Sequence, residues 1–181
     1  GQSFLPARRL VESGVRMVNA FWTFYGKDGC QFNLWDTHGI DGPVCGGYRK
    51  GVDMIKAPYC CPAFDLAYSA LLEDLTQRGM LDDTLVVVIG EFGRTPKINK
   101  QAGRDHWGSV YSTVLAGGGI RGGQVYGKSN SIGFDPAGQA CGPPDLHATI
   151  FHALGIDPEH MIYDADNRPL PLCDGKPLPL F

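Results

Sequence analysis

Three short polar motifs in this chain bring together carboxylates, imidazoles and a guanidinium. The sequence reads WDTHG at 35–39, GEFGRT at 90–95 and RDHW at 104–107. Carboxylate oxygens and imidazole nitrogens are the ligands that hard and borderline divalent metals prefer. The sequence therefore predicts a site for one divalent ion, such as Zn²⁺, Ca²⁺, Mg²⁺ or Mn²⁺. The predicted metal ligands are Asp36, His38, Glu91 and His106.

Glu91 stands at a place where α/β proteins often carry out chemistry. It follows the apolar run 86–89, whose lack of alternation is typical of a strand buried on both faces of a parallel sheet. In open sheets of that kind, ligands bind beyond the carboxyl ends of the strands. Arg94 follows in the same motif. It either pairs with Glu91 or holds an anionic substrate through its two-pronged guanidinium.

The two histidine motifs allow structural interpretations beside the functional ones. Asp36 and His38 point the same way on extended chain and can reach one ion, but an Asx-turn beside a surface histidine fits the same letters. His106 fits a metal ligand or a general acid/base, and it also fits a capping or packing histidine. The predicted catalytic residues are Arg94 and His106.

The composition fits a globular domain and argues against nucleic-acid binding and a membrane span. The chain has 181 residues, of which 43% are hydrophobic, and a net charge of −3 without a basic stripe. No run approaches the ~20 apolar residues that a membrane-spanning helix needs. Six cysteines without a C-x-x-C pair leave both disulfide bridges and reduced thiols open.

Helical periodicity and apolar runs alternate along the chain, which indicates an α/β protein. The expected fold is a single domain over 1–181, with a mostly parallel sheet flanked by helices. We also expect an irregular insertion at 39–61 and a Pro-rich tail at 157–181. The expected helices and strands cover 3–13, 15–24, 62–78, 85–89, 110–115 and 143–154. The expected core residues are Phe64, Leu71, Leu72, Leu75, Val86, Val88, Val114, Ile150 and Leu154.

Residues 122–129 match the phosphate-binding P-loop pattern G-x-x-x-x-G-K-[ST] by their letters alone. A P-loop needs a helix that begins at its lysine, because the N–H groups at the helix start hold the phosphate. The residues after Lys128 include Asn130, Gly133 and Pro136, which do not favour a helix. We therefore predict a turn or an edge strand here, and no nucleotide binding.

Four stretches give the chain a family resemblance. They read WDTHG at 35–39, VVVIGEFGRTP at 86–96, GRDHW at 103–107 and LAGGGIRGGQVYG at 115–127. These motifs resemble a sulfatase-like family, number 1501 among the domains of unknown function, within the alkaline phosphatase and sulfatase superfamily. The resemblance covers most of the chain, and only the stretches 25–34 and 40–61 look unlike the family.

The resemblance implies an alkaline-phosphatase-like fold and a metal-dependent hydrolase that acts on sulfate or phosphate esters. It places Asp36 and His38 at an Asp/His metal pair and His106 at a later histidine ligand. Glu91 and Phe92 fall where many superfamily members carry Asp-His. The implied cofactor is a divalent metal, and the implied substrate is a small anionic ester.

The resemblance also implies that the chain is the C-terminal part of a longer protein. The superfamily's nucleophile lies in an N-terminal half, and this sequence holds no recognisable nucleophile motif, so we expect the chain alone to be inactive. The missing N-terminal half is then an expected partner, and the family points to a periplasmic or extracytoplasmic location. The alternative is a catalytically inactive module that serves as a structural or assembly subunit, including one within an oligomer.

Overall fold

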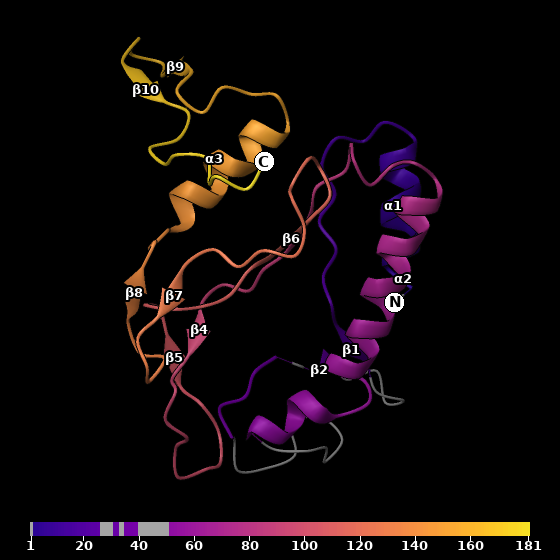
Figure 1. The fold of residues 1–181 in the computed structure, drawn as a ribbon, viewed down its shortest axis with the longest axis vertical. Coiled ribbons are helices and arrows are strands. Elements are labelled where there is room, and N and C mark those ends of the chain that lie inside the picture. The colour runs from indigo at the N-terminus through magenta and orange to yellow at the C-terminus, as the bar shows by residue number, and fades with distance from the viewer. Residues whose placement is uncertain (1, 26–30, 33–34, 40–50) are drawn as a thin grey trace. The chain divides into compact units, whose positions relative to one another are not determined.

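The computed structural model describes residues 2–25, 31–32, 35–39 and 51–181, and these form two compact units (Figure 1). Unit 1 combines residues 1–80 with 91–111, and unit 2 combines 81–90 with 112–181. Residues 40–50 of the expected insertion at 39–61 lie outside the described residues. The expectation of a single domain stays a prediction.

Two helices form the frame of unit 1. Helix α1 (Phe4–Glu12) ends before Gly14, whose φ of +93° is a conformation that glycine adopts without strain. Helix α2 (Cys61–Gln77) begins with Pro62 in its first turn, where the missing N–H of proline has no cost. The two helices lie side by side (Figure 1). A short 3₁₀ helix, η1 (Gly51–Lys56), precedes α2.

An ion-pair network joins α1 to α2. Arg8, which is only 7% exposed, contacts the carboxylates of Glu12 and Asp74, its Nε lying 2.8 Å from Asp74 Oδ2. Arg78 bonds the same two carboxylates, at 3.1 Å to Glu12 and 2.8 Å to Asp74. Each arginine therefore contacts one carboxylate from each helix, and these contacts hold α1 in place against α2.

An aromatic cluster fills the space beside α2. The Phe64 ring lies 5.3 Å from Trp22 and 5.8 Å from Trp35, both edge-on, between ring centroids. Phe4 and Tyr68 complete the cluster at 6.2 Å and 5.6 Å from Phe64. Tilted and edge-on rings at such distances are favourable. Because Trp35 directly precedes Asp36, this cluster anchors the segment that leads into the candidate site.

Two short antiparallel pairs complete unit 1. Strand β1 (Phe24–Tyr25) pairs with β2 (Gln31–Phe32), whereas residues 15–23 of the element expected over 15–24 form neither helix nor strand. Strand β4 (Gly93–Arg94) pairs with β5 (His106–Trp107) in a register that sets Arg94 opposite His106. A Cβ at Gly93 would lie 1.9 Å from the Val110 carbonyl oxygen, so this position has room for glycine only.

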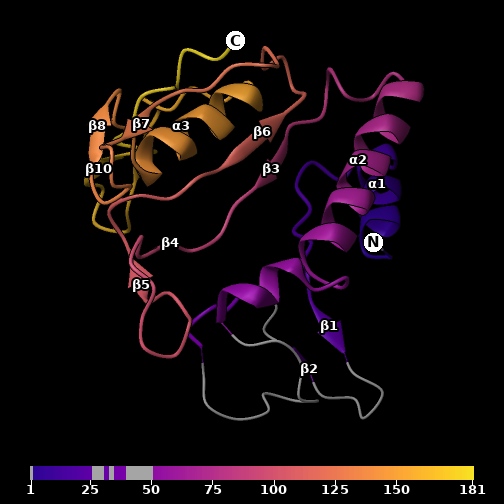
Figure 2. The same cartoon turned by 60° about the horizontal axis from the view of Figure 1, so that its bottom comes forward.

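Unit 2 contains three antiparallel pairs and one helix. Figure 2 shows two of the paired strands, β7 and β8, side by side. The pairs are β3 (Val86–Val88) with β6 (Val114–Ala116), β7 (Lys128–Ser129) with β8 (Pro136–Gly138), and β9 (Met161–Tyr163) with β10 (Pro169–Pro171). The helix is α3 (Pro143–Ala153).

The C-terminal tail is bound along α3 as a strap. The Asp145 carboxylate accepts hydrogen bonds from the Gly142 N–H at 2.9 Å and from the Lys176 N–H at 3.0 Å. One turn later, the buried Thr149 hydroxyl donates to the Asp145 carbonyl and accepts from the Leu178 N–H. The expected Pro-rich tail over 157–181 thus forms the β9–β10 hairpin and then the strap.

The expected α/β fold with a mostly parallel sheet flanked by helices, alkaline-phosphatase-like, is wrong. Among the described residues, every strand belongs to a two-stranded antiparallel sheet. Within the apolar run 86–89, Val86–Val88 form a strand that is only half-buried, and Ile89 lies outside the strand and is 50% exposed. An apolar run indicates burial but not strand direction, and the chain between β3 and β6 passes through unit 1 and returns antiparallel to β3.

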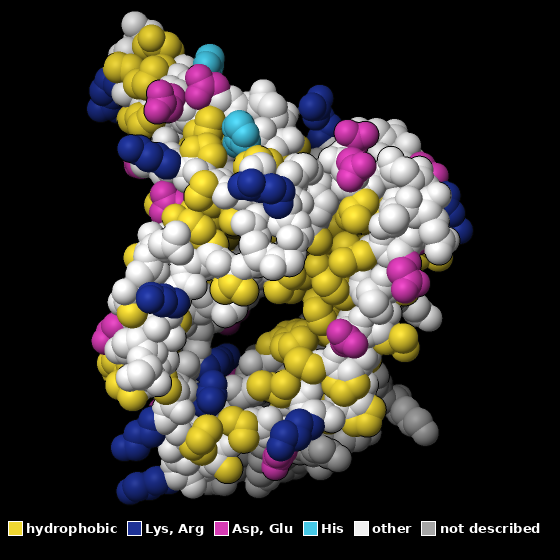
Figure 3. Space-filling view, viewed as in Figure 1, with side chains coloured by type: hydrophobic (Ala, Val, Ile, Leu, Met, Phe, Trp, Pro, Cys, Tyr) yellow, Lys and Arg dark blue, Asp and Glu magenta, His cyan; other side chains and the backbone are white. Residues whose placement is uncertain are grey.

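The core is smaller than the sequence indicates. Leu75 is 2% exposed, whereas Val114 is 49% exposed, so the expectation for Val114 is wrong. The other expected core residues are half-buried. Many apolar side chains stay at the surface, as Figure 3 shows for one face, with Val125 93% exposed. Small two-stranded sheets bury one face poorly, which accounts for this exposure.

Residues 122–129 do not form a P-loop, because no helix begins at Lys128. Lys128 lies in β7, and the described chain continues through a turn into β8 without a helix. The prediction of a turn or an edge strand is confirmed.

The described cysteines in both units carry thiols rather than bridges. Cys61, Cys141 and Cys173 are free thiols, while Cys30 and Cys45 lie outside the described residues. Burial raises the pKa of the Cys60 thiol to about 11, which keeps it protonated and unreactive. Among the described helices, none is long and apolar enough to cross a membrane.

Replacement of a buried leucine tests the packing of α2. Leu75→Ala should lower the free energy of unfolding by about 2–5 kcal/mol, because it leaves a cavity in the core. Leu66→Ala on the same helix is the control, since Leu66 is 73% exposed, and it should change the free energy by less than about 0.5 kcal/mol. Urea denaturation measures both, and equal effects would contradict the observed helix face.

The Asp145 carboxylate makes the α3 strap sensitive to acid. Hydrogen bonds from the backbone N–H groups of Gly142 and Lys176 lower the pKa of Asp145 below its ordinary value of 3.8. A lowered folded-state pKa gives stability that is complete above the ordinary pKa and is lost as the pH falls through the lowered value. Asp145→Asn should therefore lower the Tm near neutral pH, and its Tm difference from wild type should shrink below about pH 4.

Thermal melts from about pH 7 to pH 2 measure this dependence. The control is Asp65→Asn, an exposed carboxylate on α2 in unit 1. A Tm difference between wild type and Asp145→Asn that stays constant over the whole range would show that the carboxylate charge does not hold the strap.

Candidate functional site

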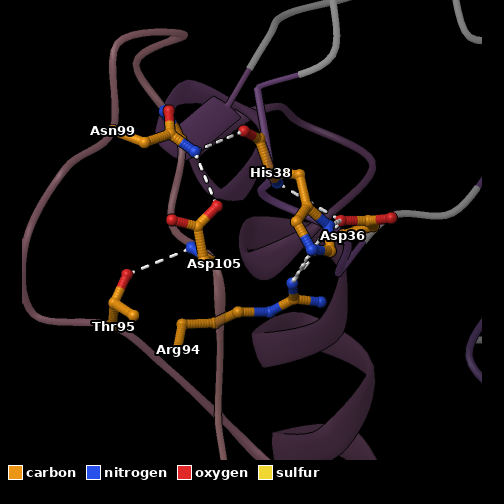
Figure 4. A network of polar contacts seen from close by, with 7 residues as sticks. Asp36, His38, Arg94, Thr95, Asn99 and Asp105 are labelled. Atoms are coloured by element: carbon orange, nitrogen blue, oxygen red, sulfur yellow. Dashed lines mark hydrogen bonds and ion pairs between the residues drawn. The ribbon is translucent and has the colours of Figure 1, made fainter.

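Three segments of unit 1 meet at the candidate site. They are the segment 36–38 and the paired strands β4 and β5 (Figure 4). Directly opposite residues of an antiparallel pair present their side chains on the same face. The β4–β5 register therefore places Arg94 and His106 on one face, and His38 contacts both of them.

Asp36 and His38 contact each other through side chain and backbone. The His38 N–H donates to Asp36 Oδ1 at 3.2 Å, which is the Asx-turn that the sequence left open. His38 Nδ1 also contacts the same oxygen. Burial opposes ionisation of Asp36, but hydrogen bonds from His38 and the charges of His38 and Arg94 outweigh it and lower the Asp36 pKa.

Arg94 lies against this pair. Its Nη1 is 3.1 Å from Nδ1 and 3.3 Å from Nε2 of His38, and 3.6 Å from Asp36 Oδ1. The Arg94 side chain is 18% exposed, so the contact is partly shielded from water. Glu91 is exposed, and among the described residues no contact joins it to these side chains. The carboxylate that pairs with Arg94 is thus Asp36 rather than Glu91.

His106 lies between two other rings. Its ring centroid is 4.3 Å from that of His38 and 4.2 Å from that of Phe92. Phe92 also faces the Arg94 guanidinium, whose carbon lies 5.7 Å from the Phe92 centroid, within cation–π range. The structure therefore brings together four of the predicted site residues, Asp36, His38, Arg94 and His106. Phe92 lies beside them.

Asn99 organises the loop between β4 and β5, and sequence reasoning missed it. Its Nδ2 donates to the His38 carbonyl at 2.9 Å and to Asp105 Oδ1 at 3.0 Å, as Figure 4 shows. Its Oδ1 accepts from the N–H groups of Gln101 and Gly103, both at 2.9 Å. Its side chain thus makes two bonds as donor and two as acceptor.

Glycines let this loop approach the segment that carries His38. A Cβ at Gly103 would lie 2.0 Å from the His38 carbonyl carbon. A Cβ at Gly39 would lie 2.1 Å from the Gln101 carbonyl oxygen, and the φ of Gly39 is +82°. The Arg104 N–H donates to the Thr37 carbonyl at 2.8 Å beside them. The signal in the sequence was the pair of glycines next to the histidine motifs.

The hydroxyl of Thr95 is committed to the loop. It accepts from the Asp105 N–H at 3.1 Å and donates to the Lys97 carbonyl at 3.0 Å. The Thr95 N–H donates to the Asp105 carbonyl at 2.9 Å. These bonds continue the β4–β5 ladder, so Thr95 supports the site rather than serving as a nucleophile.

The chemical types of these side chains suit a divalent ion, but their arrangement in the structure does not. One carboxylate and two imidazoles, from Asp36, His38 and His106, are typical ligands of Zn²⁺ and related ions. Within the described ranges, however, no group of three or more His, Cys, Asp or Glu side chains is arranged to hold a metal. Asp36 and His38 contact each other and Arg94 instead, so metal binding here needs these contacts to rearrange.

Comparison with protein families identifies the chain. The family described as "Protein of unknown function (DUF1501)" matches residues 1–179, and the chain belongs to this family. Comparison with curated proteins and with solved structures finds no match.

Removal of the Asn99 side chain tests its organising role. Asn99→Ala leaves the His38 carbonyl and the Gly103 N–H without their partner, and each such group costs about 1–3 kcal/mol where it is shielded from water. We expect a lower free energy of unfolding and faster amide exchange at Gly103. Lys100→Ala, an exposed neighbour in the same loop, is the control. Unchanged exchange at Gly103 in Asn99→Ala would contradict the assignment.

Proposed function

We propose that this member of the DUF1501 family is a divalent-metal-dependent hydrolase of sulfate or phosphate esters, with its site at Asp36, His38, Arg94 and His106. One observation carries the proposal. A guanidinium from β4, an imidazole from β5 and an Asp/His pair from the segment 36–38 meet within contact distance in a partly exposed place. Such gatherings of titratable side chains are more typical of functional sites than of packing.

Each side chain has a role suited to its chemistry. Asp36, His38 and His106 would hold the metal, and a bound divalent ion supplies Lewis-acid polarisation of an ester oxygen. Arg94 would bind the anionic oxygens of the ester, because a planar guanidinium matches sulfate and phosphate in two-pronged fashion. The alternative role for His106 is that of a general acid/base, because its exposed ring could exchange a proton with a bound ester if it does not hold the metal.

The motif resemblance to the sulfatase superfamily supports the proposed activity class. We propose the same chemistry for this chain but not the superfamily's parallel-sheet fold. In that superfamily the nucleophile lies in an N-terminal half, so we assign the reacting group to residues outside this chain. The commitment of the Thr95 hydroxyl to its loop is consistent with this assignment.

A second function, an inactive module that serves as a structural or assembly subunit, has its own support. Asp36 and His38 contact Arg94, which gives the carboxylate a countercharge without any metal. In unit 2, the β9–β10 hairpin exposes apolar side chains. These are Met161, Ile162, Tyr163 and Leu170, between 40% and 63% exposed. Exposed apolar side chains on one hairpin are compatible with a contact surface.

Metal binding separates the two functions. The purified chain is dialysed against Zn²⁺, Mn²⁺, Mg²⁺ or Ca²⁺, and bound metal is measured by elemental analysis. The hydrolase proposal expects about one ion per chain, lost in Asp36→Asn and His106→Ala but kept in the control His160→Ala, an exposed histidine of unit 2. Absence of bound metal from wild type at every ion would favour the inactive module.

Turnover tests the assignment of the nucleophile. Aryl sulfate and aryl phosphate are offered to the metal-loaded chain, and we expect no metal-dependent release of the phenol. Turnover that disappears in His106→Ala would support the hydrolase function and show that the nucleophile lies within this chain.

A further inference from the structure

Arg104 is a half-buried arginine whose guanidinium has no partner in the part of the chain that the structure describes. Its Nε atom is shielded from water and makes no hydrogen bond there. By contrast, Arg8, Arg78, Arg94 and Arg168 each form an ion pair with a carboxylate. A shielded donor on a charged side chain costs free energy until an acceptor bonds it. Arg104 therefore has unused capacity to bind an oxygen atom.

The backbone at Arg104 continues the extended chain of β5. The Thr95 N–H donates to the Asp105 carbonyl at 2.9 Å, and the Asp105 N–H donates to the Thr95 hydroxyl at 3.1 Å (Figure 4). The Arg104 N–H instead donates to the Thr37 carbonyl at 2.8 Å, away from β4. Backbone groups that bond to alternate sides at successive residues are typical of extended chain, on which side chains two residues apart share a face. Arg104 therefore lies on the same face as His106.

This face of β5 is the one that carries the candidate site. The β4–β5 register sets Arg94 opposite His106, and the centroid of the His38 ring lies 4.3 Å from that of His106. The charge of Arg94 is already offset by Asp36, whose Oδ1 lies 3.6 Å from Arg94 Nη1. Because no carboxylate of the described residues pairs with Arg104, Arg104 is the cation on this face that remains available to a negatively charged ligand.

We infer that Arg104 is an anion-binding residue of the candidate site, and that its guanidinium binds the oxygen atoms of a sulfate or phosphate group. The inference deepens the proposed function and rests on it for one point, that the anion is part of an ester. A planar guanidinium bonds two oxygens of such a group in parallel. The anion supplies the acceptor that the shielded Nε of Arg104 lacks, and this contact needs no metal.

Titration of inorganic phosphate and inorganic sulfate into the full chain, without metal, tests the inference. Isothermal titration calorimetry at constant ionic strength measures the affinities, because salt screens general attraction between exposed charges. Arg104→Gln should bind both anions roughly 10- to 150-fold more weakly than wild type, the effect of losing hydrogen bonds to a charged group. Arg104→Lys keeps the charge without the planar donors and should fall between the two. Lys100→Gln, which removes an exposed charge from the same loop, is the matched control and should stay near wild type.

The outcomes separate the inference from the proposed function. A loss of affinity in Arg104→Gln but not in Lys100→Gln supports the inference, whether or not the chain binds a metal. If wild type binds neither anion, or if the two variants lose affinity equally, the inference is overturned, and the metal measurement still decides the proposed function.

The same titrations with phenyl phosphate and phenyl sulfate distinguish an ester from a free anion. Ester affinities that equal or exceed those of the inorganic anions, and that fall in Arg104→Gln, support an ester as the ligand. Binding of the inorganic anions without binding of either ester would overturn that assignment.

A measurement on the wild-type chain keeps the inference testable if Arg104→Gln folds poorly, which its near-ultraviolet circular dichroism spectrum would show. Phenylglyoxal modifies arginine side chains, and mass spectrometry of the digested chain locates the modified residues. At constant ionic strength, inorganic phosphate should slow the modification of Arg104 and leave that of Arg9, an exposed arginine of α1, unchanged. A rate at Arg104 that phosphate does not change would overturn the inference.

Discussion

The side-chain amide of Asn99 is the interaction on which the arrangement of the site depends. Its nitrogen bonds the carbonyl of His38 and the carboxylate of Asp105, the residue next to His106 in sequence. Its oxygen bonds the N–H groups that shape the loop, including that of Gly103. One amide thus connects the segment that carries Asp36 and His38 to the strand that carries His106. Buried or half-buried amide networks of this kind fix a geometry because a partial set of bonds is costly.

The strands that carry the site residues are too short to be stable alone, since isolated two-stranded pairs are marginal in water. Side chains extend the β4–β5 pair instead. The Thr95 hydroxyl takes the Asp105 N–H that a backbone carbonyl would bond in a longer ladder. At the other end, the absence of a side chain at Gly93 allows the backbone of Val110 to approach. The aromatic cluster around Phe64 then fixes Trp35, and through it the position of Asp36.

Local signals in the sequence predicted the helices well, and non-local pairing was where prediction failed. The expected helix at 62–78 is observed as Cys61–Gln77, because proline in the first turn and Gly79 after the last are local features. The apolar run 86–89 correctly predicted a strand in this region but not the strand's direction relative to its partner. That direction is set by β6, which pairs antiparallel with β3. The site motifs brought together Asp36, His38 and His106, because each sits beside a glycine or strand end that its own neighbours define. Asn99 could not be found, since its importance comes from contacts across the loop.

The electrostatics of the site follow from one shared carboxylate. Burial opposes ionisation of Asp36, but contacts with His38 and Arg94 lower the pKa of Asp36, which favours its ionised carboxylate. Arg94 lies 3.6 Å from this carboxylate, and the Phe92 ring lies 5.7 Å from the same guanidinium. Asp36 and Arg94 offset each other's charge, and His38 lies in contact with both of them. The candidate site therefore rests on contacts among its own side chains, and a metal ion could bind at Asp36 and His38 only if those contacts rearrange.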